Sequence, residues 1–215
     1  MRIQWFGHSS FLLVSNDGTT IVTDPYEPEG YNGMIKYDPI GITPDIVTIS
    51  HNHPDHCGVD QFENDFQTIS TPGSKTIRDI KIAGFEWYHD AEMSVPNIIF
   101  LMNIDRIRVC HLGDIGSELT PQMMERIGDI DILLIPVGGR YTIGPAEATA
   151  LIGRMRPKIA IPMHYLTPKI GFQLLPVDEF LQGKDNVIVL NSTEFEITKE
   201  QLPEQTSIVI LQHAR

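Results

Sequence analysis

The amino-acid sequence predicts an α/β protein in which two β-sheets pack together, with helices on the outside. Three observations support this prediction. The first half of the 215-residue chain consists mainly of short apolar runs separated by turns, which is typical of β-strands. After residue 115, helical and strand-like segments alternate. Hydrophobic residues make up 41% of the chain, enough to bury a sizeable core, so we expect one domain over residues 1–215.

The elements of the first half are strands and turns. Asn16-Asp17-Gly18 is a strong hairpin signal between two of the strands. Residues 25–44 hold four prolines and three glycines, which predicts a long loop, and a loop of this length is usually functional or mobile. A tight turn is expected at residues 103–105. The predicted strands are Ile3–Phe6, Phe11–Ser15, Thr20–Thr23, Ile46–Ser50, Gln67–Ser70, Ile80–Ile82 with Phe85–His89, Ile98–Met102 and Arg106–His111.

The elements of the second half are helices and strands in alternation. Thr120 is a good N-cap and Pro121 a good first residue for a helix that runs to about Ile127. A second helix starts at Gly144-Pro145 and runs to about Met155. The remaining predictions are a short helix at Val177–Gln182, ended by Gly183, and strands at Ile130–Val137, Lys158–Pro162, Val187–Leu190, Glu194–Ile197 and Ser207–Gln212.

Composition and charge exclude several classes of protein. The formal net charge is −12 and the basic residues are scattered, so we expect no nucleic-acid partner, because an acidic surface repels phosphate backbones. We expect no membrane contact and a cytoplasmic location, because the sequence shows neither a membrane-spanning apolar stretch nor a signal-peptide core. Two cysteines, Cys57 and Cys110, do not make a disulfide framework. A homo-oligomer is plausible.

The most informative motif is His51-Asn52-His53-Pro54-Asp55-His56, directly after the apolar run 46–50. Imidazole nitrogens and carboxylate oxygens are ligands that zinc, iron and manganese accept. In an extended stretch, residues i and i+2 point the same way, so His51 and His53 can bind one ion together. If the chain then turns, Asp55 and His56 face a second ion.

Further ligand candidates lie where other predicted strands end. His89, His111 and His164 each occupy such a position, and His8 lies between two early strands. Asp114 follows His111 and can bridge two cations, because a carboxylate has two oxygens. These residues alone do not decide whether His89 or His111 completes the first metal site.

The sequence resembles the metallo-β-lactamase superfamily, and within it the small metal-dependent hydrolases related to the ascorbate-phosphate lactonase branch. The resemblance is carried by the motif at 51–56, by Asp114 in His-Leu-Gly-Asp and by His164 in Ile-Pro-Met-His-Tyr. Gly7-His8-Ser9-Ser10-Phe11 and Thr23-Asp24-Pro25 add to it. It implies a four-layer αββα sandwich with metal ions at one edge of the sheets.

The resemblance also implies roles for individual residues. The first metal would be bound by His51, His53 and His89, the second by Asp55, His56 and His164, and Asp114 would bridge them. Asp24 and His8 would orient ligands from behind, and His111 is kept as a near-site alternative to His89. Asp55 and Tyr165 are the predicted catalytic residues. The loop after the strand 130–137 precedes a helix N-terminus, so Arg140 and Tyr141 are predicted to recognise an anionic group on a small-molecule substrate.

These residues favour a hydrolase. Two divalent metal ions, zinc first and manganese or iron as alternatives, would activate water against an ester, lactone or phosphodiester bond. One rival is an iron-dependent oxidoreductase of the same fold, similar to persulfide oxygenases, although His53 at the middle of the motif favours hydrolysis over di-iron chemistry. The others are an RNA-processing nuclease, against which the acidic charge counts, and a non-enzymatic metal sensor.

Overall fold

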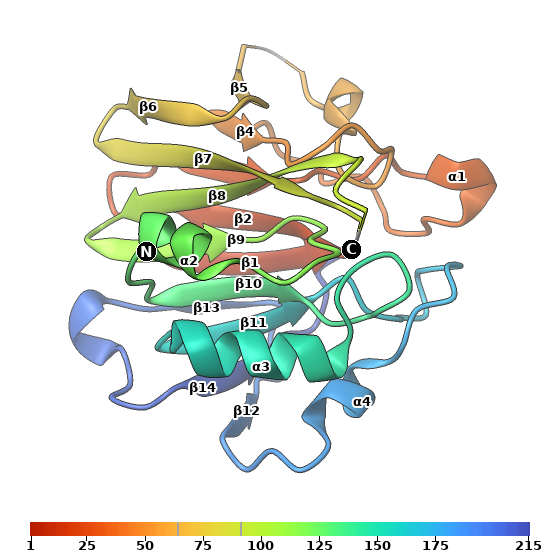
Figure 1. The fold of residues 1–215 in the computed structure, drawn as a ribbon. Helices are drawn as coiled ribbons and strands as arrows, with labels where there is room; N and C mark the ends of the chain where they lie inside the picture. The colour runs from red at the N-terminus through yellow and green to blue at the C-terminus, as the bar shows by residue number, and fades with distance from the viewer. Residues whose placement is uncertain (64, 91) are drawn as a thin grey trace.

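The computed structural model describes residues 1–63, 65–90 and 92–215, and it contains two β-sheets packed face to face (Figure 1). Within these residues the first sheet has six strands, in the order β13-β1-β2-β3-β4-β5, and the second has eight, in the order β12-β14-β11-β10-β9-β8-β7-β6. The strands are β1 (Arg2–Gly7), β2 (Ser10–Val14), β3 (Thr20–Thr23), β4 (Ile46–Thr48), β5 (Gln67–Ile69), β6 (Gly73–Ile77), β7 (Ile80–Tyr88), β8 (Pro96–Ile104), β9 (Ile107–His111), β10 (Ile132–Pro136), β11 (Ile159–Met163), β12 (Val187–Val189), β13 (Glu194–Glu196) and β14 (Ser207–Ile210). The predicted two-sheet α/β fold is confirmed.

The longer helices cover the eight-stranded sheet. Figure 1 shows α2 (Pro121–Ile127) and α3 (Pro145–Met155) on the near side of that sheet, where they follow β9 and β10. The predicted N-cap is present: Thr120 Oγ1 accepts a hydrogen bond of 3.1 Å from the backbone N–H of Met123. The short helices are α1 (Gly30–Gly33), α4 (Val177–Leu181), η1 (Val59–Gln61) and η2 (Lys199–Gln201). Within the described residues, every helix is too short or too polar to cross a bilayer.

The central strands of the six-stranded sheet are buried on both faces, which explains their near-continuous apolar runs. Leu13, Ile21 and Ile46 point into the core between the sheets, whereas their neighbours on the same strands join a second apolar cluster on the other face. That second cluster draws most of its remaining side chains from loops, so the layer outside this sheet is largely loop. Its buried members are Phe6, Leu12, Val22, Tyr26, Ile35, Tyr37, Ile40, Val47, Phe62, Ile170 and Leu174.

Three local predictions differ from the structure. Strand β6 was not expected, because four of its five residues are exposed and give no apolar pattern. The two predicted pieces at 80–82 and 85–89 form one strand, β7, which continues through Ala83 and Gly84 in pairing with β8. The β8–β9 turn lies at Asp105 and Arg106, which have φ values of 50° and 67°, because Ile104 and Ile107 close the hairpin.

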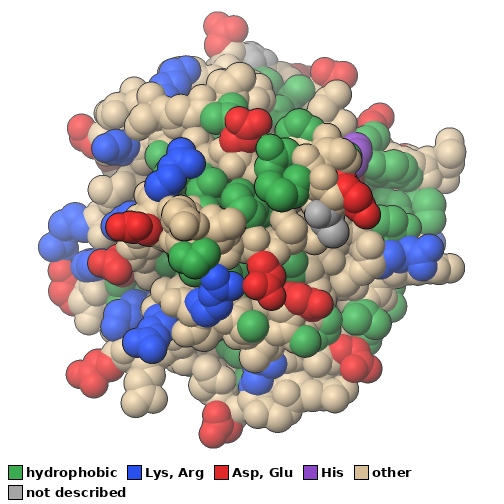
Figure 2. All heavy atoms as spheres, viewed as in Figure 1, with side chains coloured by type: hydrophobic (Ala, Val, Ile, Leu, Met, Phe, Trp, Pro, Cys, Tyr) green, Lys and Arg blue, Asp and Glu red, His purple; other side chains and the backbone are tan. Residues whose placement is uncertain are grey.

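Acidic and basic side chains are interspersed on the face seen in Figure 2. The hydrophobic side chains visible there gather towards the side of the molecule where α1 lies in Figure 1. That side is also the edge at which the predicted site residues are found.

Candidate metal centre

The predicted site residues meet at one edge of the two sheets because each follows the end of a strand. In a sandwich of this kind, loops from both sheets reach a common edge. The backbone N–H of His164 donates to the carbonyl of His8 (3.1 Å), which ties β11 of one sheet to the β1–β2 turn of the other. The residues and their strands are His8 after β1, Asp24 after β3, His51, His53, Asp55 and His56 after β4, His89 after β7, His111 and Asp114 at and after β9, and His164 after β11.

Potential ligand atoms of the described residues form three groups, of which one (Asp24, His51 and His56) shares its histidines with the other two. We take the other two as the candidate metal-binding groups. His51, His53 and His89 offer atoms that all lie within 4.8 Å of one another. Asp55, His56 and His164 do the same and are joined by His8. The groups coincide with the two triads expected from the sequence, with His8 added to the second.

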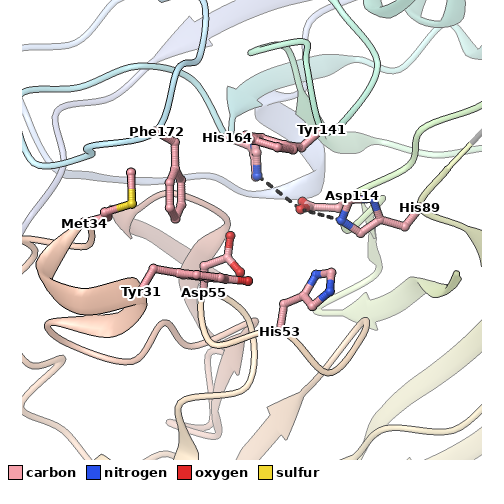
Figure 3. A pocket seen from close by; sticks show the side chains of 9 residues that line it. All are labelled: Tyr31, Met34, His53, Asp55, His89, Asp114, Tyr141, His164 and Phe172. Atoms are coloured by element: carbon pink, nitrogen blue, oxygen red, sulfur yellow. Dashed lines mark ion pairs between the residues drawn. The ribbon is translucent and has the colours of Figure 1, made fainter.

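Asp114 lies between the two groups (Figure 3). Its Oδ2 is 3.0 Å from Nε2 of His56 and 3.1 Å from Nε2 of His164. It is also 3.6 Å from Nε2 of His89 and 4.0 Å from Nε2 of His51. One carboxylate oxygen therefore faces imidazole nitrogens of both groups, which is the position that a bridging ligand requires.

The geometry distinguishes His89 from His111. His111 is fully buried and both of its ring nitrogens are engaged: Nε2 donates to the carbonyl of Ser9 (2.9 Å), and Nδ1 accepts from the backbone N–H of Gly113 (3.1 Å). With both nitrogens used, His111 has no free lone pair for a metal ion. The structure brings His89, and not His111, together with His51 and His53.

Hydrogen bonds from behind orient the ligand imidazoles. Asp24 Oδ2 accepts from Nδ1 of His56 (2.8 Å) and from Oγ of Ser50 (2.5 Å). Because that hydroxyl donates to Asp24, it accepts from Nδ1 of His51, which lies 2.9 Å away. With Nδ1–H fixed in both rings, the Nε2 lone pairs of His51 and His56 point into the site. His8 Nε2 similarly lies 2.9 Å from Oδ2 of Asp55.

The residues present fit metal ions. Nε2 of His51, Oδ1 of Asp55 and Oδ1 of Asp114 are buried and have no hydrogen-bond partner among the described residues. Such an unpartnered group costs about 1–3 kcal/mol when buried. Imidazole nitrogen and carboxylate oxygen are the donors that zinc takes at about 2.0–2.2 Å. An ion bound here would satisfy atoms that the protein itself leaves without partners.

The charge of the site also suits cations. Burial works to raise the pKa of Asp55, but His56 and His8 outweigh it and hold that pKa well below its usual value. Burial is likewise outweighed at Asp114, whose pKa is held well below normal by His164 and His56. Burial lowers the pKa of His51 to about 3, which leaves its ring neutral. At His56 the effect of burial is outweighed by Asp114 and Asp55, which raise its pKa well above normal. Ionised carboxylates and neutral imidazole are the forms that bind metal, so His56 would release a proton when an ion binds.

Gly113 positions Asp114 through an unusual backbone conformation. Its φ is +56°, a left-handed value, and a Cβ built there would collide with Oδ1 of Asn97 and lie 2.6 Å from Cβ of Ser50. Asn97 uses the same oxygen to accept from the backbone N–H of Asp114 (3.0 Å). Only glycine permits this close packing, so the side chain that faces both groups depends on the residue before it.

A cavity of about 320 Å³ opens onto the site (Figure 3). Tyr141 lines it, as the sequence suggested for a substrate-contacting residue. Tyr31, Met34 and Phe172 line it as well and were not singled out by sequence reasoning, which predicted only a long loop at 25–44, of the kind that is usually functional or mobile. The lining residues are Tyr31, Met34, His53, Asp55, His89, Asp114, Tyr141, His164 and Phe172.

Two residues predicted to contact the substrate do not line this cavity. Tyr165 is buried against Trp5, with ring centroids 5.2 Å apart. Arg140 is exposed, and its guanidinium donates to the hydroxyl of the cavity-lining Tyr141 (3.2 Å) and to Gln173 (2.5 Å). The expected catalytic role of Tyr165 has no support in this geometry, and the expected anion contact of Arg140 stays a prediction.

Comparison with known proteins gives the same family as the motif. The family model of the β-lactamase superfamily domain matches residues 2–164, which include every residue of both groups. The chain belongs to the metallo-β-lactamase superfamily.

Individual members of the superfamily resemble most of the chain. A UPF0173 protein of Pyrococcus abyssi is 33% identical, over 78% of this chain and 84% of its own length. A protein named UPF0173 metal-dependent hydrolase, from Archaeoglobus fulgidus, is 27% identical over the same shares. A solved structure from Thermotoga maritima, titled as a Zn-dependent hydrolase of the metallo-β-lactamase superfamily, is 40% identical with a TM-score of 0.80, over 98% of this chain and 99% of that one.

Proposed function

We propose that this protein is a metal-dependent hydrolase that uses two divalent metal ions, zinc first, to cleave an ester, lactone or phosphodiester bond. The observation that carries the proposal is the position of Asp114 Oδ2 between two groups of imidazole nitrogens, at 3.0–4.0 Å from four of them. The names of the relatives from Archaeoglobus fulgidus and Thermotoga maritima agree with metal-dependent hydrolysis.

The ligand assignment follows the two groups. His51, His53 and His89 would hold one ion, and Asp55, His56 and His164 the other, with Asp114 shared. Bound there, the ions would lower the pKa of a coordinated water towards 7 and so supply hydroxide at neutral pH.

The protein's own residues would keep this arrangement rigid. Asp24 and Ser50 hold the rings of His56 and His51 with their Nε2 atoms facing the site. His8 restrains the carboxylate of Asp55 through the 2.9 Å contact, and Asp55 lines the cavity where the substrate would enter. Asp55 is the residue we expect to accept the proton of the attacking water.

Metal analysis combined with single substitutions tests the proposal. The protein should bind two metal ions per chain after reconstitution with zinc, and a screen of ester, lactone, phosphodiester and thioester substrates should reveal turnover. His89→Ala and His164→Ala remove one ligand from each group, so each should lower the metal content by about one ion. Asp114→Ala should lower it further, because this carboxylate faces both groups.

A His53→Ala variant with full metal content and full activity would contradict the site assignment. Iron-loaded protein with visible absorption and sulfur-dependent oxygen uptake, in the absence of hydrolysis, would instead favour the oxidoreductase. Binding of no metal by the wild-type protein would refute both enzymes.

A further inference from the structure

The lining of the cavity contains two kinds of side chain. Among the described residues that line it, His53, Asp55, His89, Asp114 and His164 belong to the proposed metal centre. The others are Tyr31, Met34, Tyr141 and Phe172, which we call the apolar wall; in Figure 3, Tyr31, Met34 and Phe172 lie together and Tyr141 lies beside His164. Phe172 lies at its middle, with its ring 5.2 Å from that of Tyr31 and 6.3 Å from that of Tyr141, both in edge-on orientation.

Three large side chains of the apolar wall are exposed to solvent. Tyr31, Met34 and Tyr141 have exposed fractions of 37%, 39% and 44%. Hydrophobic side chains also gather on the side of the molecule near α1 in Figure 2. Large apolar side chains that are exposed next to one another often mark a binding site, because their exposure to water is unfavourable. Here they line the same cavity as the proposed metal centre, which suits a small molecule.

The apolar wall is preformed, because the two loops that carry most of it are joined by backbone hydrogen bonds. Gly171 N–H donates to the carbonyl of Met34 (2.7 Å), and Lys36 N–H donates to the carbonyl of Lys169 (2.8 Å). Ile35 and Ile170 are paired in an isolated bridge between these bonds. A ligand would therefore meet an ordered surface and would not have to arrange it.

Charge limits what can lie against the apolar wall. Within the described part of the chain, the cavity lining contains no Lys or Arg, and the guanidinium of Arg140 donates to the hydroxyl of Tyr141 and to Gln173. A carboxylate or phosphate placed against the wall would lose its hydration and would have to displace these two oxygens to reach that cation. An aromatic ring would instead meet three rings and a thioether, which favour edge-on aromatic contacts.

We infer that the cavity selects a ligand whose uncharged aromatic group lies against the apolar wall. Under the proposed function, on which this inference rests, the substrate is an aryl- or arylalkyl-substituted ester or lactone, with its carbonyl facing the metal centre and its ring facing Phe172. This narrows the proposed function to a substrate class and replaces the anionic substrate that the sequence suggested.

Hydroxamates test the inference without requiring turnover, because they chelate divalent metals and differ only in their side group. Zinc-loaded protein is titrated calorimetrically with acetohydroxamate, phenylacetohydroxamate and succinic monohydroxamate. The phenyl compound should bind at least about tenfold more tightly than the other two. Phe172→Ala should reduce this advantage to below about threefold while leaving the acetohydroxamate affinity unchanged. Val189→Ala is the matched control, since it trims an apolar side chain that is 64% exposed on β12, and it should keep the full advantage.

The outcomes separate this inference from the proposed function. Equal affinity for the three compounds, or preference for the anionic one, would overturn the inference even if esters are hydrolysed. A phenyl preference that depends on Phe172, in a protein that hydrolyses none of the substrates screened, would support the inference and refute the proposed function. Binding of no hydroxamate to zinc-loaded protein would overturn both. If circular dichroism shows that Phe172→Ala is unfolded, Tyr141→Ala removes an exposed ring of the same wall and decides the question.

Discussion

Replacing Gly113 by alanine should destabilise the protein by about 3 kcal/mol. Two effects add at this position. The φ of +56° is left-handed, which costs an L-residue about 1–2 kcal/mol. The new Cβ must also enter a packed space occupied by Asn97 and by Ser50 at 2.6 Å, and such overpacking costs about 1–3 kcal/mol. For a chain of this size, about 3 kcal/mol corresponds to roughly 6–12 °C in Tm.

Two further glycines allow the effects to be measured separately. Gly18 has a φ of +86° but open space around its Cβ position, so Gly18→Ala should show the backbone cost alone. Gly153 lies in α3 with open space and no left-handed φ, so Gly153→Ala should be neutral or stabilise by up to about 1 kcal/mol. Tm is measured by calorimetry on the zinc-loaded protein, and metal content is determined for each variant.

The difference in Tm between Gly113→Ala and Gly18→Ala measures the cost of close packing at Gly113. Gly113→Ala should melt lower than Gly18→Ala by roughly 2–8 °C, since about 1–2 kcal/mol of its cost comes from close packing, and it alone should lose metal, because it displaces Asp114. Equal melting temperatures for these two variants, or full metal content in Gly113→Ala, would refute the view that close packing against Asn97 holds Asp114 in place.

Three more predictions concern the site. Tyr31→Phe should lower kcat roughly tenfold, because the Tyr31 hydroxyl points into the cavity, is kept protonated by burial and by Asp55, and can donate to charge that develops on the substrate. Tyr165→Phe should change kcat less than about twofold, and equal effects would show that the Tyr31 hydroxyl takes no part in turnover. His8→Ala should lower activity about 10–100-fold, with partial rescue in His8→Gln, which can still donate to Asp55; the absence of rescue would mean that His8 acts otherwise. Removing metal with a chelator should reversibly lower the free energy of unfolding by roughly 2.7 kcal/mol, the value expected for a ligand present at 100 times its Kd, and so lower Tm by several degrees. A Tm unaffected by zinc would show that the folded protein does not bind it.

The parts of the site that sequence could predict are those tied to strand ends. The motif at 51–56, Asp114 and His164 each follow an apolar run, and a run of that kind is readable from local pattern alone. Strand β6 escaped prediction because its residues face solvent and its position is fixed by pairing with β7. Pairing between strands is a property of the folded sheet, and an exposed edge strand has little apolar pattern in its sequence from which that pairing could be predicted.

The apolar wall could not be predicted for a similar reason. Tyr31 has a φ of 51°, a value that bulky residues rarely adopt, and its segment is held by contacts with residues 167–171, far away in the sequence. Tyr165 illustrates the opposite error. Its place beside His164 suggested a role in the site, but its ring packs on Trp5, because neighbouring residues direct their side chains to different sides of the backbone.

The backbone hydrogen bond between His164 and His8 has a consequence for when the proposed metal centre can assemble. The two groups draw their side chains from the six-stranded and the eight-stranded sheet, and the residue that contributes last, His164, follows β11 late in the chain. A nascent chain that has not yet exposed β11 outside the ribosome lacks part of the second group. The second ion of the proposed centre could therefore find its full set of ligands only after β11 has been synthesised and the two sheets have packed together.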